Sequence, residues 1–222
     1  MKIVQCWDDG VLDDIRLIEI LRRHGAKASF NLNLGTQPPQ RKASWKYREV
    51  KEVWKLGKDE LREVYAGFTI ANHSARHLRL TEVPREAAVE DVRVGRELLE
   101  QHFGCAVTGF AYPCGLFNPE VEEIIAETGH IYGRTTKYVA CAFPPERPMA
   151  FHSNCHFAAA DFWDRFDLAK AEKHPVFYFW GHSYEMIEDA QWAAMDAKIA
   201  RLSSDPDCEW ADLPELFPAS SK

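Results

Sequence analysis

The sequence predicts a (β/α) barrel, because short apolar runs typical of strands alternate with amphipathic helical stretches along the chain. About seven or eight such strand–helix units fit into the 222 residues. An open, doubly wound parallel sheet is the rival arrangement. A chain of this length can bury a sizeable core as one unit, and no repeat or low-complexity stretch divides it. We therefore expect a single domain over residues 1–222.

The predicted strands are apolar runs, often with β-branched or aromatic residues, that are bounded by polar segments. The first, "KIVQCW", begins almost at the first residue, and a strongly aromatic one, "VFYFW", lies near the C-terminal end. In chain order the strands are expected at residues 2–7, 27–33, 68–73, 109–113, 131–136, 149–154, 176–180 and 209–213. In a barrel of parallel strands, the carboxyl ends of these runs gather at one face.

The predicted helices lie between these runs, where apolar residues recur three and four positions apart. They are expected at residues 13–24, 58–65, 84–103, 118–128, 159–170 and 189–202. The longest begins at Pro84, a residue favoured in the first turn, and carries Ala88, Val92 and Leu99 on one face. The segment 34–58 contains two consecutive prolines and many charged residues, which indicates a polar insertion.

The composition is that of an ordinary globular protein. Hydrophobic residues make up 46% of the chain, charged residues 27%, and the net charge is −7, which is a poor match to a phosphate backbone, so we expect no nucleic-acid partner. No apolar signal region precedes the first strand and no apolar run is long enough to cross a bilayer, which favours a cytoplasmic protein without a membrane partner. The six cysteines form no CxxC pair, which indicates reduced thiols.

Several polar residues follow the predicted strands directly, at the end of a barrel where catalytic groups gather. They are Asp8, Asp9, His73, Tyr112, Arg134 and His182. His73 and His77 are four residues apart, so a helical turn after the third strand would aim both imidazoles at one point. A carboxylate from another strand would complete a His/His/Asp metal site with open positions. The adjacent aspartates then have separate uses, because one can bind the metal while the other acts as a base.

Four motifs in order, "CWDDG", "HSARH", "FAYPCG" and "FWGHSYE", resemble those of the polysaccharide deacetylases, the NodB-like carbohydrate esterases of family four. The resemblance runs from residue 3 to about residue 190, and "GAKASFNLN" is similar to the family's second strand. It implies a distorted or incomplete (β/α) barrel of seven to eight strands. It also implies a hydrolase that removes acetyl groups from a carbohydrate.

The resemblance also implies roles for individual residues. Asp8 would be the general base, and His182 the general acid. One divalent metal ion, zinc in preference to cobalt or nickel, would be held by Asp9, His73 and His77. Substrate or oxyanion contacts would come from Tyr112, Cys114 and Arg134, with a backbone N–H near Cys114 as the oxyanion donor.

The chain departs from the family pattern in the third and fourth motifs. Ala111 stands where many members have Arg, and Cys114 where they have Tyr. Arg134 can supply the missing charge, although a surface or structural arginine is an equally good interpretation. The family's acidic residue that tunes the acid histidine is not evident. The candidates are Asp161, Asp164 and Asp167, around Trp163.

Two further groups can line the substrate pocket. His152 and His156 form a second pair four residues apart, but no carboxylate near them in the sequence completes a metal site, which favours pocket lining or core hydrogen bonds. In the insertion, Trp45, Tyr47 and Trp54 can stack on a sugar or simply plug the barrel edge. The basic residues that accompany them, suited to an anionic substrate, are Arg41, Lys42, Lys46 and Arg48.

The leading hypothesis is therefore a metal-dependent deacetylase of a small or oligomeric acetylated carbohydrate. The first alternative is a hydrolase of the same fold that acts on a non-sugar amide or cyclic imide, and the presence of Asp9, His73 and His77 argues against a metal-free version. The second alternative is an inactive sugar-binding module, which would need neither Asp8 nor His182. The sequence carries no signal for an oligomeric state.

Overall fold

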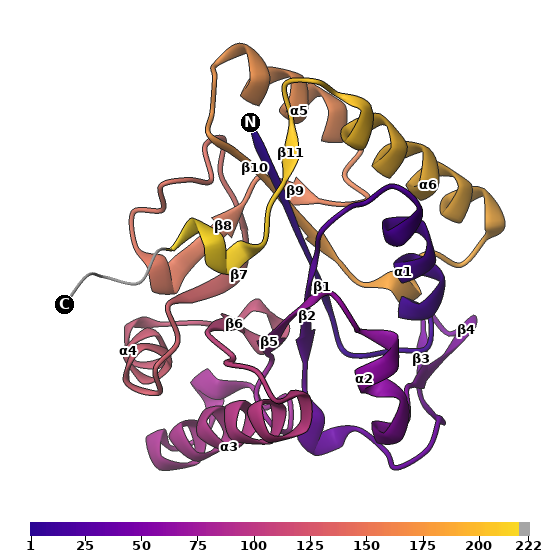
Figure 1. Cartoon of the computed structure of the whole chain (residues 1–222). Coiled ribbons are helices and arrows are strands. Elements are labelled where there is room, and N and C mark those ends of the chain that lie inside the picture. Colours follow the sequence, from indigo (N-terminus) through magenta and orange to yellow (C-terminus); the bar gives the residue numbers. More distant parts are fainter. Residues whose placement is uncertain (218–222) are drawn as a thin grey trace.

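The computed structural model of the protein describes residues 1–217, so the last five residues of the predicted domain, 218–222, lie outside the described residues. Parallel strands form a nearly closed barrel in the middle of the molecule, with helices around it (Figure 1). Among the described residues, no helix is both long and apolar enough to span a membrane.

The barrel strands are paired in parallel throughout. Their spatial order is β8 (Phe151–Ser153), β7 (Tyr132–Tyr138), β6 (Gly109–Ala111), β5 (Thr69–Asn72), β2 (Ser29–Leu32), β1 (Lys2–Asp8), β10 (Val176–Gly181) and β9 (Cys155–His156). A short further strand, β11 (Glu209–Trp210), pairs with the start of β1. The predicted strands are confirmed, and the rival open sheet is wrong.

The ring closes at Asn154, the single residue between β8 and β9. Its backbone N–H donates to the Tyr178 carbonyl at 2.7 Å, and its side-chain oxygen accepts from the Tyr178 N–H at 2.7 Å. One continuous stretch of chain therefore contacts β7 on one side and β10 on the other.

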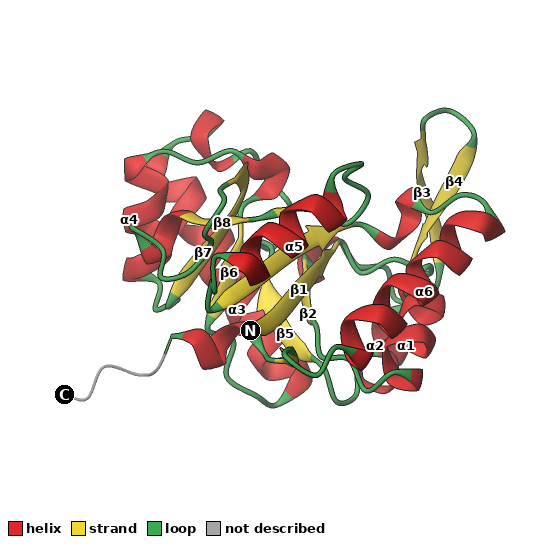
Figure 2. Ribbon diagram, turned by 90° about the horizontal axis from the view of Figure 1, so that it is seen from above, coloured by secondary structure: helices red, strands yellow, loops and turns green. Residues whose placement is uncertain are grey.

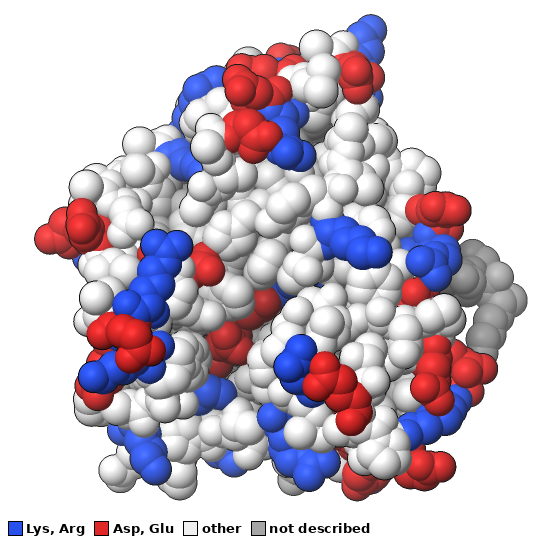
Figure 3. Space-filling model, turned by 180° about the vertical axis from the view of Figure 1, so that it is seen from behind, with Lys and Arg blue, Asp and Glu red and all other residues white. Residues whose placement is uncertain are grey.

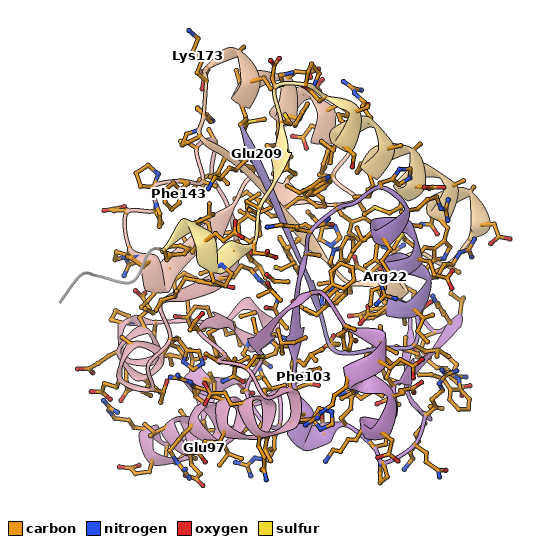
Figure 4. All side chains as sticks on the ribbon, in the orientation of Figure 1. Arg22, Glu97, Phe103, Phe143, Lys173 and Glu209 are labelled. Carbon is orange, nitrogen blue, oxygen red and sulfur yellow. The ribbon has the colours of Figure 1, made fainter. Side chains whose placement is uncertain are left out.

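Six α-helices lie outside the barrel within residues 1–217 and confirm the predicted helical segments. They are α1 (Asp14–Arg23), α2 (Leu61–Val64), α3 (Arg85–Phe103), α4 (Pro119–Glu127), α5 (Phe162–Ala171) and α6 (Asp189–Ser204). Helices α1 and α6 lie side by side on one flank, and α3 and α4 on another (Figure 1). Charged side chains such as Glu97 and Lys173 point away from the barrel (Figure 4).

Strand β1 shows how the sequence divides the core. Successive side chains of a strand point to opposite faces. Ile3 and Trp7 accordingly pack outward against the helices, whereas Val4 and Cys6 pack in a second cluster with Tyr178. Asp8 continues the alternation of Val4 and Cys6, so its carboxylate lies at the carboxyl end of the barrel interior.

The insertion contains one element that the sequence did not predict. Strands β3 (Lys42–Tyr47) and β4 (Lys51–Lys55) form an antiparallel hairpin that projects beside α1 and α6 (Figure 2). The hairpin is joined to the loop after β1, because the Leu12 N–H donates to the Trp54 carbonyl at 2.8 Å and the Leu56 N–H to the Gly10 carbonyl at 3.2 Å. This attachment brings hairpin residues to the mouth of the barrel.

Surface charge is mixed. On the face seen in Figure 3, Lys and Arg side chains are scattered rather than gathered into one patch, and acidic atoms are visible in a hollow near its centre. All six cysteines are free, with Cys6 and Cys155 buried.

Candidate active site

The residues predicted at strand ends meet at the carboxyl end of the barrel. Asp8 ends β1, His73 follows β5, and His182 follows β10. The Nε2 atoms of His73 and His182 lie 4.0 and 3.8 Å from Asp8 Oδ2. The same two atoms lie 3.9 Å from carboxylate oxygens of Asp9. Residues more than 170 positions apart in sequence therefore share one small volume.

The backbone changes direction at Asp9, directly after Asp8. Asp8 keeps the strand conformation, whereas Asp9 has a left-handed backbone with φ of 84°, which is uncommon for a residue other than glycine and often marks a functional site. The Asp9 N–H is held by the Asn31 carbonyl at 3.1 Å. The Asp8 carboxylate consequently faces the barrel interior, and Asp9 faces the two histidines of the "HSARH" motif.

Asp9, His73 and His77 can hold a metal ion, because one ligand atom from each lies within 4.8 Å of the others. His73 Nδ1 lies 2.7 Å from the Ala111 carbonyl, so it carries the proton and Nε2 offers its lone pair toward Asp9. Burial lowers the pKa of His73 to about 4, which keeps the imidazole neutral at pH 7. Two imidazoles and a carboxylate fit zinc and leave open positions.

The predicted helical turn that would present these histidines is wrong. Residues 73–79 form an irregular loop in which Ser74 and His77 have left-handed φ values of 59° and 58°. The loop is held against α3, since the Ala75 N–H donates to the Asp91 carbonyl at 2.9 Å. A side chain at Gly95 would collide with this loop, which explains the glycine in the middle of α3. Two residues with left-handed backbones thus bring the imidazoles of His73 and His77 together, which a helical turn was expected to do.

Arg134 lies against Asp8, and its backbone pairs in register with Ala111, the residue that stands at the position of the family's arginine. Its Nη2 atom donates to both Asp8 oxygens, at 2.5 Å to Oδ1, and its guanidinium lies over the Trp180 ring at 4.7 Å. Burial acts to raise the pKa of Asp8, but Arg134, with His73 and His182, holds it below its ordinary value. Arg134 is 1% exposed, so the surface interpretation is wrong.

Glu185 partners His182, and sequence reasoning missed it. Glu185 Oε1 lies 3.3 Å from His182 Nδ1, so the Nδ1 proton points to a carboxylate. Burial acts to lower the pKa of His182, but the Glu185 hydrogen bond and the charges of Asp8 and Asp9 raise it above the ordinary value. The available signal was the three-residue spacing within "HSYE", which a 3₁₀ turn over Ser183–Glu185 brings together.

The three aspartates considered for this role are wrong. Asp161, Asp164 and Asp167 lie at the exposed surface of the α5 region, where Asp161 pairs with Arg165 at 2.8 Å and Asp167 with Arg201 at 3.6 Å.

His156 contacts the second carboxylate oxygen of Glu185. Its Nε2 atom lies 2.8 Å from Glu185 Oε2, although the contact is too bent to count as a hydrogen bond, and its Nδ1 accepts the Ala158 N–H at 3.3 Å. Burial acts to raise the pKa of Glu185, but His156 and His182 lower it to about 2. The argument that no carboxylate completes a metal site at His156 is therefore wrong, because Glu185, distant in sequence, lies beside it and the two form a possible ligand set with His182. His152 lies apart, with Nδ1 2.6 Å from the Thr135 hydroxyl.

The third motif contributes less than expected. The Tyr112 hydroxyl donates to the Met149 carbonyl at 2.6 Å and the Tyr112 N–H to the Arg134 carbonyl at 3.1 Å, so neither is free for substrate, and this assignment is wrong. Cys114 lies in the following turn with φ of 56° and an exposed side chain.

A pocket of about 370 Å³ opens beside the metal-ligand residues. It is lined by Asp9, Asn33, Thr36, Ser44, Trp45, Lys55, His77 and Tyr184. Trp45 packs edge-on against Tyr184, with ring centroids 5.3 Å apart, so one of the insertion's predicted aromatics does reach the site. Tyr47 also packs on Tyr184 but lines a neighbouring pocket, of about 420 Å³, with His156 and Glu185.

The basic residues named for the insertion do not line the 370 Å³ pocket. Arg41 makes a bidentate ion pair with Glu60, whereas Lys42 and Lys46 are exposed. Arg48 lines the neighbouring pocket, with its guanidinium 5.1 Å from the Tyr47 ring centroid. Lys55, which sequence reasoning passed over, is the cation that lines the pocket beside Asp9.

Comparison with known proteins gives one family match. The sequence model described as polysaccharide deacetylase matches residues 1–133. No curated protein is similar enough in sequence to be matched.

Among solved structures, the Xyl-CE4 domain of a multidomain xylanase from the hindgut metagenome of Trinervitermes trinervoides superposes with a TM-score of 0.61 at 15% identity, over 97% of this chain and 89% of that one. BA3943 from Bacillus anthracis, described as a CE4 family pseudoenzyme, gives 0.60 at 18% identity, over 97% of this chain and 65% of that one. The Streptococcus pyogenes deacetylase PplD gives 0.50 at 20% identity, over 60% of this chain and 55% of that one. The chain thus spans about half of PplD and two thirds of BA3943. At these identities the similarity shows a shared fold.

Proposed function

The chain belongs to the polysaccharide deacetylase family, and from that premise we propose that it is a metal-dependent hydrolase that removes N- or O-acetyl groups from a carbohydrate. The observation that carries the proposal is the meeting, within about 4 Å, of three different chemical groups: the ionised Asp8, the Asp9/His73/His77 set and the imidazole of His182. Hydrolysis of an acetyl group needs a base, an electrophile and an acid, and each group suits one of these roles.

In this proposal Asp9, His73 and His77 hold one divalent metal, with zinc preferred over cobalt or nickel for two imidazoles and a carboxylate. When bound there, the metal supplies a Lewis acid for the acetyl carbonyl and for water. Asp8 takes the proton from the attacking water. Arg134 keeps Asp8 ionised and fixed in position, the role that the family's missing arginine would otherwise have.

His182 completes the reaction by giving its Nε2 proton to the leaving nitrogen or oxygen. Its Nδ1 proton faces Glu185, and this contact fixes the orientation of the ring and favours the protonated form. The backbone N–H of Cys114 is the proposed oxyanion donor, because the left-handed turn after Tyr112 sets the direction of that peptide.

The substrate is proposed to be a monosaccharide or a short oligosaccharide. Trp45 on the inserted hairpin stands beside Asp9 and His77 and offers an aromatic surface for one sugar ring. The inactive sugar-binding alternative is not favoured, although a pseudoenzyme of this fold exists. Binding alone would not require Asp8 to be paired with a buried arginine.

The test is acetate release by the metal-analysed protein from N- and O-acetylated mono- and oligosaccharides, beside the matched polymer at equal acetyl concentration. We expect release from the short sugars. The matched control is Asp8→Asn, which should keep the metal while activity falls on the order of 100-fold. Because this change leaves Arg134 buried without its partner, circular dichroism must first establish that the variant is folded.

Two results would count against the proposal. No release from any substrate by the metal-loaded protein would refute the deacetylase function. A clear preference for the polymer would leave the reaction standing and refute the small substrate.

A further inference from the structure

Lys55, at the end of β4, is a buried cation without an ion pair. It is 6% exposed, and its Nζ atom donates to Asn33 Oδ1 and Thr36 Oγ1, each at 2.7 Å. Both acceptors are neutral, and within residues 1–217 no carboxylate oxygen lies within the 4.0 Å of a salt bridge. An ammonium has three N–H donors, so one has no partner among the described residues. Buried lysines are normally paired with an acid.

Lys55 also has a fixed position relative to the metal-ligand residues. Its backbone forms an antiparallel bridge with Val11, two residues after Asp9, and the next residue, Leu56, donates its N–H to the Gly10 carbonyl. Lys55 therefore cannot move away without undocking the hairpin. Lys55 lines the 370 Å³ pocket together with its two hydrogen-bond acceptors, Asn33 and Thr36, and with the aromatic residues Trp45 and Tyr184.

The charges in this pocket do not balance once Asp9 binds a metal. Asp9 is the only acidic residue among those that line it. If that carboxylate is used by the metal, no protein anion is left for the ammonium. A ligand in the pocket would then meet an aromatic surface, a metal site and an unpaired donor cation, a combination that suits a carboxylate carried on a sugar.

We propose that Lys55 binds a carboxylate group of the substrate, so that the site favours acetylated sugars with a carboxylate near the acetyl group over their neutral counterparts. The proposal rests on the proposed function, because the pocket is taken to hold the sugar during deacetylation. It differs from a purely structural role, in which Lys55 would only orient Asn33, whose Nδ2 lies 3.4 Å from Asp9 Oδ1.

The test compares two carboxylate sugars, N-acetylmuramic acid and N-acetylglucosaminuronic acid, with neutral N-acetylglucosamine. For the unmodified protein we expect kcat/KM to be about tenfold higher on at least one acid, the size of one charge-assisted hydrogen bond. Lys55→Gln keeps a donor for Asn33 and Thr36 but removes the charge, so the ratio of acid to neutral sugar should fall to about one. The matched control is Lys46→Gln, an exposed lysine on the other strand of the hairpin, which should keep the ratio.

Three outcomes would overturn the inference. They are a protein that prefers the neutral sugar over both acids, a Lys55→Gln variant whose ratio is unchanged because kcat falls equally on all three sugars, and a variant that loses the metal. Binding of the same sugars to the metal-loaded Asp8→Asn protein, measured by calorimetry with and without Lys55→Gln, separates this inference from the deacetylase proposal. It reports carboxylate recognition even if no acetyl group is released.

Discussion

The two sides of the site contain the same kinds of side chain, but the pKa of one histidine on each side moves in the opposite direction. On the metal-ligand side, Asp9 stands with His73 and His77, and on the acid side Glu185 stands with His182 and His156. The Nδ1–H of His73 faces a neutral backbone carbonyl, and burial lowers the pKa of that imidazole to about 4. The Nδ1 of His182 faces a carboxylate instead, and its pKa is raised.

The difference teaches that the hydrogen-bond partner of Nδ1 decides whether Nε2 of a buried histidine can act as a metal ligand or as an acid. A neutral acceptor leaves the imidazole neutral with a free lone pair, which suits a metal ligand. A carboxylate favours the imidazolium, which suits an acid. His156 is similar, because its Nδ1 accepts the Ala158 N–H, so the proton of the neutral ring is on Nε2, the atom 2.8 Å from Glu185 Oε2. The acid side is therefore arranged as two imidazoles around one carboxylate acceptor, Glu185.

The largest effect should come from breaking the metal-ligand side. His73→Ala removes one of three protein ligands, and we expect the affinity for zinc to fall by several kcal/mol, on the order of 100-fold or more, with activity lost in parallel. Metal content by atomic emission and affinity by calorimetry measure this. His102→Ala, on α3, is the matched control. A His73→Ala protein that keeps one metal per chain at unchanged affinity would show that the ligand set is wrong.

The barrel could be predicted because its strands and most of its helices carry local signals. Apolar runs such as "VFYFW" and the helical spacing of Val92 and Leu99 follow directly from burial on a strand or a helix face. The hairpin β3–β4 was missed because its signal is short and lies in a highly charged segment. In β3, the half-buried Trp45 and Tyr47 alternate with exposed residues, and they are covered by a small cluster that includes Tyr184 from a distant part of the chain.

The site was predictable where a residue's position at a strand end determined its place, as for Asp8, His73 and His182. The prediction failed where a turn or the hairpin determined the position of the residue. Glu185 reaches His182 through a 3₁₀ turn, and Lys55 reaches the pocket only because the hairpin docks on the loop after β1. Tyr112 was misassigned because the direction of its side chain depends on packing against Phe110 and Phe117, which sequence spacing does not reveal.

A smaller effect, with a different signature, is expected on the acid side. Glu185→Gln removes the charge that raises the pKa of His182, so that pKa falls and the acid loses its proton at a lower pH. The alkaline limb of the kcat/KM profile should move down by about one pH unit, with metal content unchanged. Glu19→Gln, an exposed acid on α1, is the control. An alkaline limb that stays in place would mean that Glu185 does not tune the acid.

The smallest effect should come from His156, which acts on His182 only through Glu185. Its contact with Glu185 Oε2 is short but bent, and Glu185, with a pKa of about 2, would stay charged near pH 7 without it. We therefore expect His156→Ala to lower kcat about two- to fivefold, the loss of one weak positioning contact, while the alkaline limb stays where it is. His156→Gln, which keeps an N–H donor, should recover part of the rate. If the alkaline limb of His156→Ala shifts as far as that of Glu185→Gln, His156 also sets the pKa of His182. If His156→Ala loses a second metal equivalent, the acid side binds metal as well, which would remove the contrast between the two sides.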